Sequence, residues 1–163
     1  MAIYHKNPHD QYNFYATLQE NNLSLPPLAF ETLWLNITTF CNQACDHCHM
    51  DASPSSLEFM DRATINKCLN LLEENPQCLT LDITGGEPEL HPDFKYVVIR
   101  ARQLEKKVTV RHNLTVTIDE NPINGENMEY LPEFFAENRV TVLASLPHYM
   151  RETVNQIRGR IDA

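Results

Sequence analysis

The chain has 163 residues, of which 42% are hydrophobic, and it carries a formal net charge of -9. This length suffices for one domain with a hydrophobic core, and the acidic balance argues against a nucleic-acid-binding protein, whose surface must neutralise phosphates. No apolar run approaches the roughly 20 residues that span a bilayer, and the N-terminus lacks the apolar segment of a signal peptide. We therefore expect a cytoplasmic protein that binds neither nucleic acid nor membrane.

The first 30 residues differ in composition from the rest of the chain. Residues 1–30 are polar and rich in Asn, Gln, Tyr and Pro. This composition predicts an irregular or short-helical lead-in, which leaves residues 31–163 as the organised domain. The apolar run of residues 33–38 predicts the first strand of that domain, with Trp34 in the core. A cysteine-containing loop, residues 41–48, follows this strand directly.

Helix and strand patterns alternate after this loop. A helix is predicted from Ser55 or Ser56 to about Leu72, and Asn75 and Pro76 stop it. Its expected buried face consists of Met60, Ala63, Cys68, Leu71 and Leu72. Apolar patterns further along the chain predict strands at 79–83, 108–112 and 140–144. Further helices are expected at 94–104 and near 131–135, with a last amphipathic segment from about 149.

This alternation predicts the fold class. Strands that alternate with helices at such spacing form βαβ units and a parallel sheet, which is an α/β fold. Four strands are too few to close an eight-stranded barrel. We therefore expect a partial (βα) barrel of about four parallel strands with helices outside. Such a chain is a natural truncation, a fragment, or a half-barrel that a second chain completes.

Three of the five cysteines stand close together, at Cys41, Cys45 and Cys48. An odd number of crowded cysteines is unlike a secreted disulfide framework and indicates a metal site in a reducing compartment. Three thiolates without a fourth suit an iron–sulfur cluster that keeps one iron open to a ligand. The alternative is a tetrahedral zinc site with His47 or His49 as the fourth ligand. The position of the loop after the first strand favours the cluster, because α/β sheets bind ligands at that edge.

A second motif, Gly85-Gly86-Glu87-Pro88, ends the second predicted strand. Two glycines allow the backbone to approach a ligand closely, and Glu87 offers a carboxylate to an ammonium group. Taken alone, this tetrapeptide is typical of an ordinary strand-to-helix turn. However, the motif follows the cysteine loop by one βα unit, so we expect it at the same edge of the sheet as that loop.

Together the two motifs resemble those of the radical S-adenosylmethionine (SAM) superfamily. The resemblance implies an enzyme in which Cys41, Cys45 and Cys48 ligate a [4Fe-4S] cluster and the open iron chelates the methionine group of SAM. It implies cofactor contacts by His47, Gly85, Gly86 and Glu87. It also implies an external electron donor, such as ferredoxin or flavodoxin, whose electron cleaves the sulfonium C–S bond of SAM to release a 5′-deoxyadenosyl radical.

A narrower resemblance covers residues 24–161. Residues 41–52, 81–86, 111–116, 144–147 and 158–160 resemble, in the same order, the arsenosugar-biosynthesis radical enzymes. This implies 5′-deoxyadenosyl transfer to a small methylated arsenic species. Two features depart from that subgroup: Glu87 replaces a residue that is often small there, and the remaining barrel strands and a Cys-rich C-terminal domain are absent. The rival interpretation is a non-catalytic iron–sulfur or zinc-binding module.

Other polar residues are weaker candidates. Asn113 and Ser145 lie near the ends of the third and fourth predicted strands, where they can hydrogen-bond the ribose or carboxylate of the cofactor or simply cap a loop. Arg158 and Arg160 can meet an anionic substrate group or form a solvated basic end. The two remaining cysteines, Cys68 and Cys78, are expected to be structural.

Overall fold

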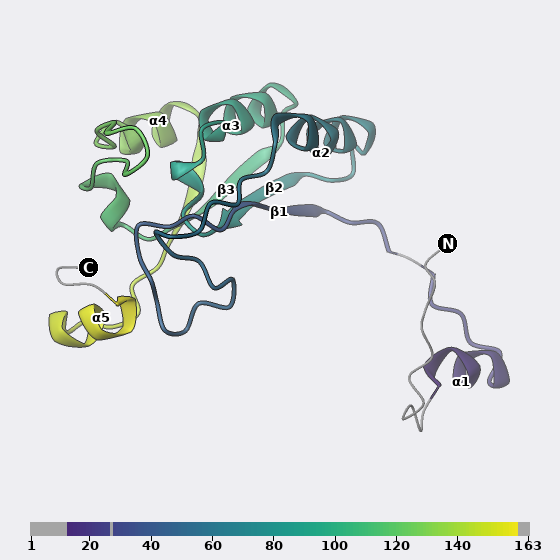
Figure 1. Cartoon of the computed structure of the whole chain (residues 1–163). Coiled ribbons are helices and arrows are strands. Elements are labelled where there is room, and N and C mark those ends of the chain that lie inside the picture. The colour runs from purple at the N-terminus through teal and green to yellow at the C-terminus, as the bar shows by residue number, and fades with distance from the viewer. Residues whose placement is uncertain (1–12, 27, 160–163) are drawn as a thin grey trace.

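The computed structural model describes residues 13–26 and 28–159 (Figure 1). Four parallel strands form one sheet in the order β1-β2-β3-β4. Their bounds are Thr32–Thr38, Thr80–Gly85, Lys107–His112 and Val140–Ala144. The predicted α/β fold, a partial barrel of about four parallel strands with helices outside, is confirmed.

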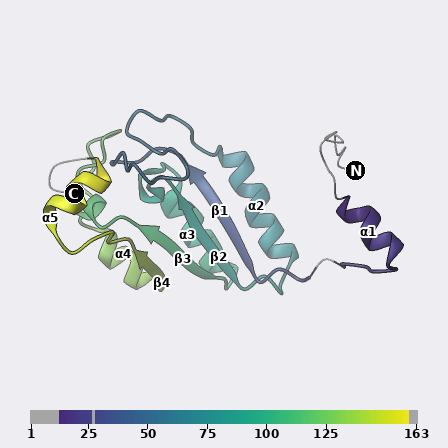
Figure 2. The same cartoon turned by 90° about the horizontal axis from the view of Figure 1, so that it is seen from below.

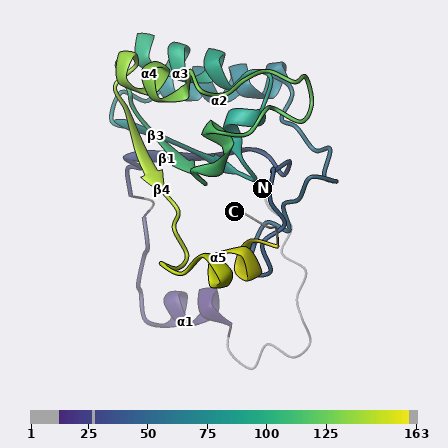
Figure 3. The same ribbon diagram turned by 90° about the vertical axis from the view of Figure 1, so that its left-hand side faces the viewer.

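The helices divide between the two sides of the sheet (Figures 1 and 3). One face is covered by α2, α3 and α4, which span Arg62–Glu74, Phe94–Gln103 and Leu131–Glu137. Helix α5, Arg151–Arg158, lies on the other side, and α1, Phe14–Glu20, contributes no buried side chain. Two short 3-10 helices follow β2 and β3, at Pro88–Leu90 and Thr115–Thr117. Within the described residues, none of the helices is long and apolar enough to cross a membrane.

The core lies between the sheet and the three helices that cover it (Figure 2). Side chains alternate between the two faces of a strand, so every second residue points toward these helices. The sheet contributes buried apolar side chains from Leu35, Ile37, Leu81, Ile83, Val108 and Val110. The helices contribute Ile65, Leu69, Leu72, Phe94, Val97, Val98, Ala101, Leu131 and Phe135. One face of the sheet is therefore apolar and packed, and the other carries the alternate residues.

The predicted start of the helix at Ser55 or Ser56 is wrong. Helix α2 begins after Asp61, whose side chain accepts a hydrogen bond from the Thr64 N–H at 2.7 Å. The preceding residues pair with the end of β1 instead, and the Met60 N–H donates to the Ile37 carbonyl at 2.8 Å. The later start changes the buried face, which consists of Ile65, Leu69 and Leu72 and leaves Leu71 largely exposed.

The prediction that Trp34 lies in the core is also wrong. Leu35 and Ile37 point toward the helices, so Trp34 points to the opposite face, where its side chain is 67% exposed. The guanidinium carbon of Arg111 lies 4.9 Å from the centre of its ring. The structural assignment of two cysteines is confirmed, since Cys78 is fully buried and Cys68 packs against the core.

Leu81 tests the position of the core. Leu81→Ala should lower the free energy of unfolding by about 2–5 kcal/mol, because it leaves a cavity between β2 and the helices. Leu79, two residues earlier, is exposed, and Leu79→Ala should change the stability by less than about 0.5 kcal/mol. Urea unfolding followed by circular dichroism measures both. Equal losses in the two variants would contradict the assignment of faces.

Candidate functional site

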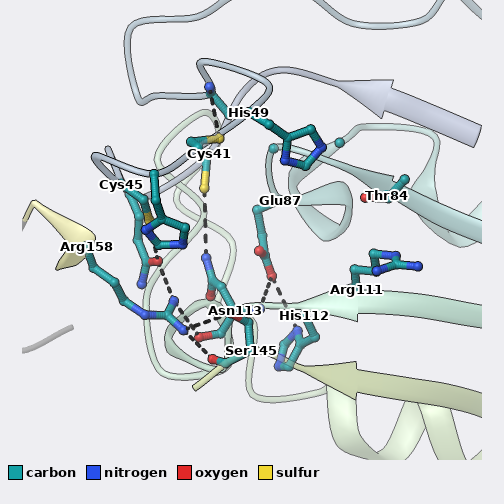
Figure 4. A pocket seen from close by; sticks show the side chains of 16 residues that line it. Cys41, Cys45, His49, Thr84, Glu87, Arg111, His112, Asn113, Ser145 and Arg158 are labelled. Atoms are coloured by element: carbon teal, nitrogen blue, oxygen red, sulfur yellow. Dashed lines mark hydrogen bonds and ion pairs between the residues drawn. The ribbon is translucent and has the colours of Figure 1, made fainter. Parts of the chain in front are cut away.

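The carboxyl ends of the strands and the cysteine loop surround a cavity of about 170 Å³ (Figure 4). The structure brings every residue predicted to bind the cluster or the cofactor to this one cavity. Its lining includes Cys41, Cys45, His47, Cys48, Gly85, Gly86, Glu87, Asn113 and Ser145. Parallel strands end at the same edge of a sheet, so loops that are distant in sequence meet there. His49 lies on the exposed loop and also lines the cavity.

The two glycines of the second motif hold the cysteine loop against β2. The Gly86 N–H donates to the Thr38 carbonyl at 2.7 Å, and the Glu87 N–H donates to the Phe40 carbonyl at 2.8 Å. A Cβ on Gly86 would stand 2.2 Å from the Phe40 oxygen, and one on Gly85 would stand 2.2 Å from the Thr38 oxygen. The glycines therefore permit a close approach of two protein backbones, and Cys41 follows directly on this contact.

The thiols of the cysteine loop have few protein partners. Asn113 Nδ2 lies 3.9 Å from Cys41 Sγ, and the Ala52 N–H donates to Cys48 Sγ at 3.4 Å. Burial raises the pKa of the Cys41 thiol to about 12. Burial also raises the pKa of Cys45, although the positive charge of Arg158 opposes that shift. Both thiols are therefore protonated at neutral pH without a metal, and metal binding must release these protons.

Glu87 belongs to a buried group of three ionisable side chains. His112 Nδ1 lies 2.9 Å from Glu89 Oε1 and 3.3 Å from Glu87 Oε1. Burial and the nearby charge of Glu89 raise the pKa of Glu87 well above its ordinary value. Burial alone would lower the pKa of His112, but its hydrogen bonds to the two carboxylates outweigh that effect and raise it to about 9. Glu87 and His112 thus hold more protons in the folded protein than they do in water.

Asn113 links the end of β3 to the cysteine loop. Its Nδ2 donates to Asn42 Oδ1 at 2.6 Å, and its Oδ1 accepts from the Val116 N–H at 3.1 Å. Its own N–H donates to Glu87 Oε1 at 3.2 Å. The side-chain oxygen thus caps a loop, as the alternative interpretation expected, while the amide nitrogen reaches toward Cys41.

Sequence reasoning did not predict the contacts that Arg158 makes within the protein. Of its two predicted alternatives, the solvated basic end is wrong, because Arg158 is only 3% exposed. Its guanidinium donates to the Asn113 carbonyl at 3.1 Å, and also to the Gln43 side-chain oxygen and the Ser145 carbonyl. Arg158 therefore joins α5 to the ends of β3 and β4 and to the cysteine loop. Arg160 lies outside the described residues.

Gly159 is the residue in the sequence that could have indicated this close packing of α5. It adopts φ +66° at the end of α5, and a Cβ there would stand 2.4 Å from the Ala44 carbonyl oxygen. Beside it, the Asp46 N–H donates to the Ile157 carbonyl at 3.2 Å. A glycine directly after an arginine predicts a helix end with close backbone contact, but the sequence does not identify the loop it contacts.

Comparisons with known proteins agree with this geometry. The sequence profile of the Radical SAM superfamily matches residues 35–162. AlbA of Bacillus subtilis (strain 168), an antilisterial bacteriocin subtilosin biosynthesis protein, is 30% identical over 124 residues, which cover 76% of this chain and 26% of AlbA. YydG of the same strain, whose name assigns it to peptide biosynthesis, is 26% identical over 115 residues, which cover 70% of this chain and 34% of YydG. The chain spans about a quarter to a third of the length of these relatives.

Crystal structures of SuiB from Streptococcus suis have a similar fold. The structure bound to S-adenosylmethionine has a TM-score of 0.63 and 21% identity, covering 90% of this chain and 31% of SuiB. The structure bound to the precursor peptide SuiA has a TM-score of 0.64 and 20% identity, covering 99% of this chain and 36% of that one. At such identities the likeness shows the shared fold.

Gly86 tests the backbone contact that positions the cysteine loop. Gly86→Ala should lower the free energy of unfolding by at least about 2 kcal/mol, because neither backbone can yield to a Cβ placed 2.2 Å from the Phe40 oxygen. Gly125 has φ +69° and open space around it, so Gly125→Ala should cost only the conformational strain of about 1 kcal/mol. Urea unfolding compares them. Equal costs would show that the contact does not constrain the loop.

The buried group of Glu87, Glu89 and His112 should make stability depend on pH. The folded pKa of His112 is about 9, above its ordinary value, and that of Glu87 is raised as well. The folded state therefore binds more protons, and stability falls as the pH rises from about 6.5 to about 9. His112→Gln should flatten this part of the profile, measured as the free energy of unfolding against pH. A fall that persists unchanged in His112→Gln would contradict this origin.

Proposed function

The chain belongs to the radical SAM superfamily, and from that premise we propose that it binds a [4Fe-4S] cluster through Cys41, Cys45 and Cys48. We propose that it cleaves SAM reductively and that residues 31–163 form the unit that does so. The superfamily uses these two cofactors. When bound, the cluster and SAM supply the one-electron cleavage of the sulfonium C–S bond, and an external reductant of the ferredoxin or flavodoxin type supplies the electron.

One observation carries this proposal: the cysteine loop and the Gly-Gly-Glu motif line the same cavity. Three thiols without a fourth protein ligand suit a cluster with one open iron. A small single ion needs its ligand atoms close together. Among the described residues, the ligand atoms of Glu87, Glu89 and His112 form the one such group within 4.8 Å. The three thiols are therefore spaced more widely than a zinc ion requires, which supports the cluster over zinc.

We propose that Glu87 and Arg158 hold the two polar ends of the cofactor's methionine group. The Glu87 side chain, buried in the cavity wall, offers an oxygen that can accept a hydrogen bond from the amino group. Arg158 suits the carboxylate, because among the described residues its guanidinium contacts neutral oxygens and forms no ion pair. A buried charge ordinarily has an opposite partner, so an anionic ligand would complete this arrangement.

The other residues that were predicted to bind the cofactor make additional contacts in this proposal. His47 is exposed at the rim of the cavity, where it can lie beside the adenine. Ser145 accepts a long contact of 3.5 Å from Arg158 at its hydroxyl, so it can hydrogen-bond the carboxylate or ribose as well. Asn113 contacts both Glu87 and Cys41 and positions them relative to each other.

We propose a peptide as the substrate. The names of AlbA and YydG concern the biosynthesis of a bacteriocin and of a peptide, and SuiB has been crystallised with a precursor peptide. The second candidate is a small methylated arsenic species that accepts a 5′-deoxyadenosyl group. It is favoured by the resemblance of residues 41–52 and 111–116 to arsenosugar-biosynthesis enzymes, while AlbA, YydG and SuiB favour the peptide.

Reductive cleavage of SAM tests the proposal. The chain, reconstituted anaerobically with iron and sulfide and given dithionite and SAM, should form 5′-deoxyadenosine. Cys45→Ala should reduce the product by at least about a hundredfold, because ligand loss removes the site-differentiated cluster. Cys68→Ala, on the packed side of α2, is the matched control and should retain activity. Chromatography of 5′-deoxyadenosine and iron analysis measure the outcome.

Four contrary outcomes are distinct. A bound cluster without 5′-deoxyadenosine would favour the non-catalytic iron–sulfur module, and zinc in place of iron would overturn the radical assignment. Product that survives in Cys45→Ala would overturn the ligand assignment. Dimethylated trivalent arsenic that acquires a deoxyadenosyl group would favour the second candidate over the peptide.

A further inference from the structure

The face of the sheet opposite the helices carries an unusual set of side chains. Trp34 on β1 is paired in register with Asp82 on β2, and Arg111 on β3 reaches both. Arg111 Nη2 lies 3.0 Å from Asp82 Oδ2, and Arg111 Nε lies 3.3 Å from Asp82 Oδ1. The guanidinium is thus held by a buried carboxylate and lies against an aromatic ring that is itself exposed.

This face differs from a surface made for packing. The interior of a packed barrel is filled by bulky branched apolar side chains. Here many of the same positions carry polar side chains, at Asn36, Thr84, Thr109, Arg111 and Thr141, beside the apolar Trp34 and Leu143. The exposed apolar surface of Trp34 gains free energy when the apolar side chain of a ligand covers it.

Arg111 connects this surface with the cofactor cavity. It lines the cavity together with Thr84, and its side chain is still 44% exposed (Figure 4). Asp82 engages its Nε and Nη2, and among the described residues its Nη1 has no hydrogen-bond partner. The pair is electrically neutral, so the free donor suits a neutral acceptor such as a peptide carbonyl. The Trp34 ring next to it suits an aromatic or apolar side chain.

We propose that Trp34, Asp82 and Arg111 form a peptide-binding subsite beside the cofactor cavity. It holds an aromatic side chain of the peptide against Trp34 and a neighbouring carbonyl oxygen on Arg111 Nη1. Asp82 positions the guanidinium for that contact. The assignment of a peptide rests on the proposed function, but its binding can be measured without catalysis.

Trp34 is the sole tryptophan of the chain, so its fluorescence reports on this subsite alone. A blocked tripeptide with phenylalanine between two alanines should shift the emission to shorter wavelength in a saturable way. A blocked trialanine should need a much higher concentration. In Arg111→Gln the half-saturating peptide concentration should rise roughly tenfold, because a hydrogen bond to a charged group is lost. Arg111→Lys should show part of that loss, since it lacks the planar fork.

Two control variants accompany the titration. Thr141→Val, on the same face but on β4, should leave the peptide titration unchanged. Trp34→Phe lacks the sole tryptophan and gives the background emission of the chain. An unchanged spectrum up to the solubility limit of the peptide, or equal titrations in wild type and Arg111→Gln, would overturn the subsite. An emission shift that follows protein concentration without peptide would assign this face to a second copy of the chain and overturn the proposal as well.

The same reconstituted samples are assayed for 5′-deoxyadenosine. Peptide binding without this product would retain the subsite and reject the proposed reaction. Product without peptide binding would retain the reaction and reject the subsite. The two failures are therefore distinguishable in one set of samples.

Discussion

The site depends on a main-chain contact between two loops. The backbone of Gly86 and Glu87 donates two hydrogen bonds to Thr38 and Phe40, which lead into the cysteine loop. These bonds form only because Gly85 and Gly86 lack a Cβ at positions where one would overlap a carbonyl oxygen. Both motifs are therefore parts of one backbone structure, and this structure determines the positions of their side chains at the cavity.

A second layer of contacts closes the site from the other side of the sheet. Arg158 carries a buried positive charge to the ends of β3 and β4, and Gly159 lets α5 approach Ala44. Glu87 and His112 also line the cavity, and Glu89 joins them in a buried hydrogen-bonded group. The cavity thus combines a buried guanidinium with a group of buried side chains that share protons.

Much of this arrangement could be predicted from the sequence, because local patterns determine it. Alternating apolar residues identified all four strands, and the spacing of three cysteines identified the loop. What the sequence did not reveal depends on contacts between distant segments. The start of α2 is determined by pairing of Met60 with β1, and the burial of Arg158 is determined by a turn of the chain back beneath the sheet. The hydrophobic character of Trp34 predicts a core position. The alternation of side chains along β1 instead places it on the face of the sheet that Leu35 does not share.

The contact between Arg158 and Gln43 has a consequence for the order of biosynthesis. These residues are separated by 115 positions in sequence, so the cysteine loop cannot acquire its final support until nearly all of this segment has left the ribosome. The first three βα units can pack earlier, because their contacts are between sequence neighbours. During translation the cysteine loop therefore acquires its final contacts later than the core does.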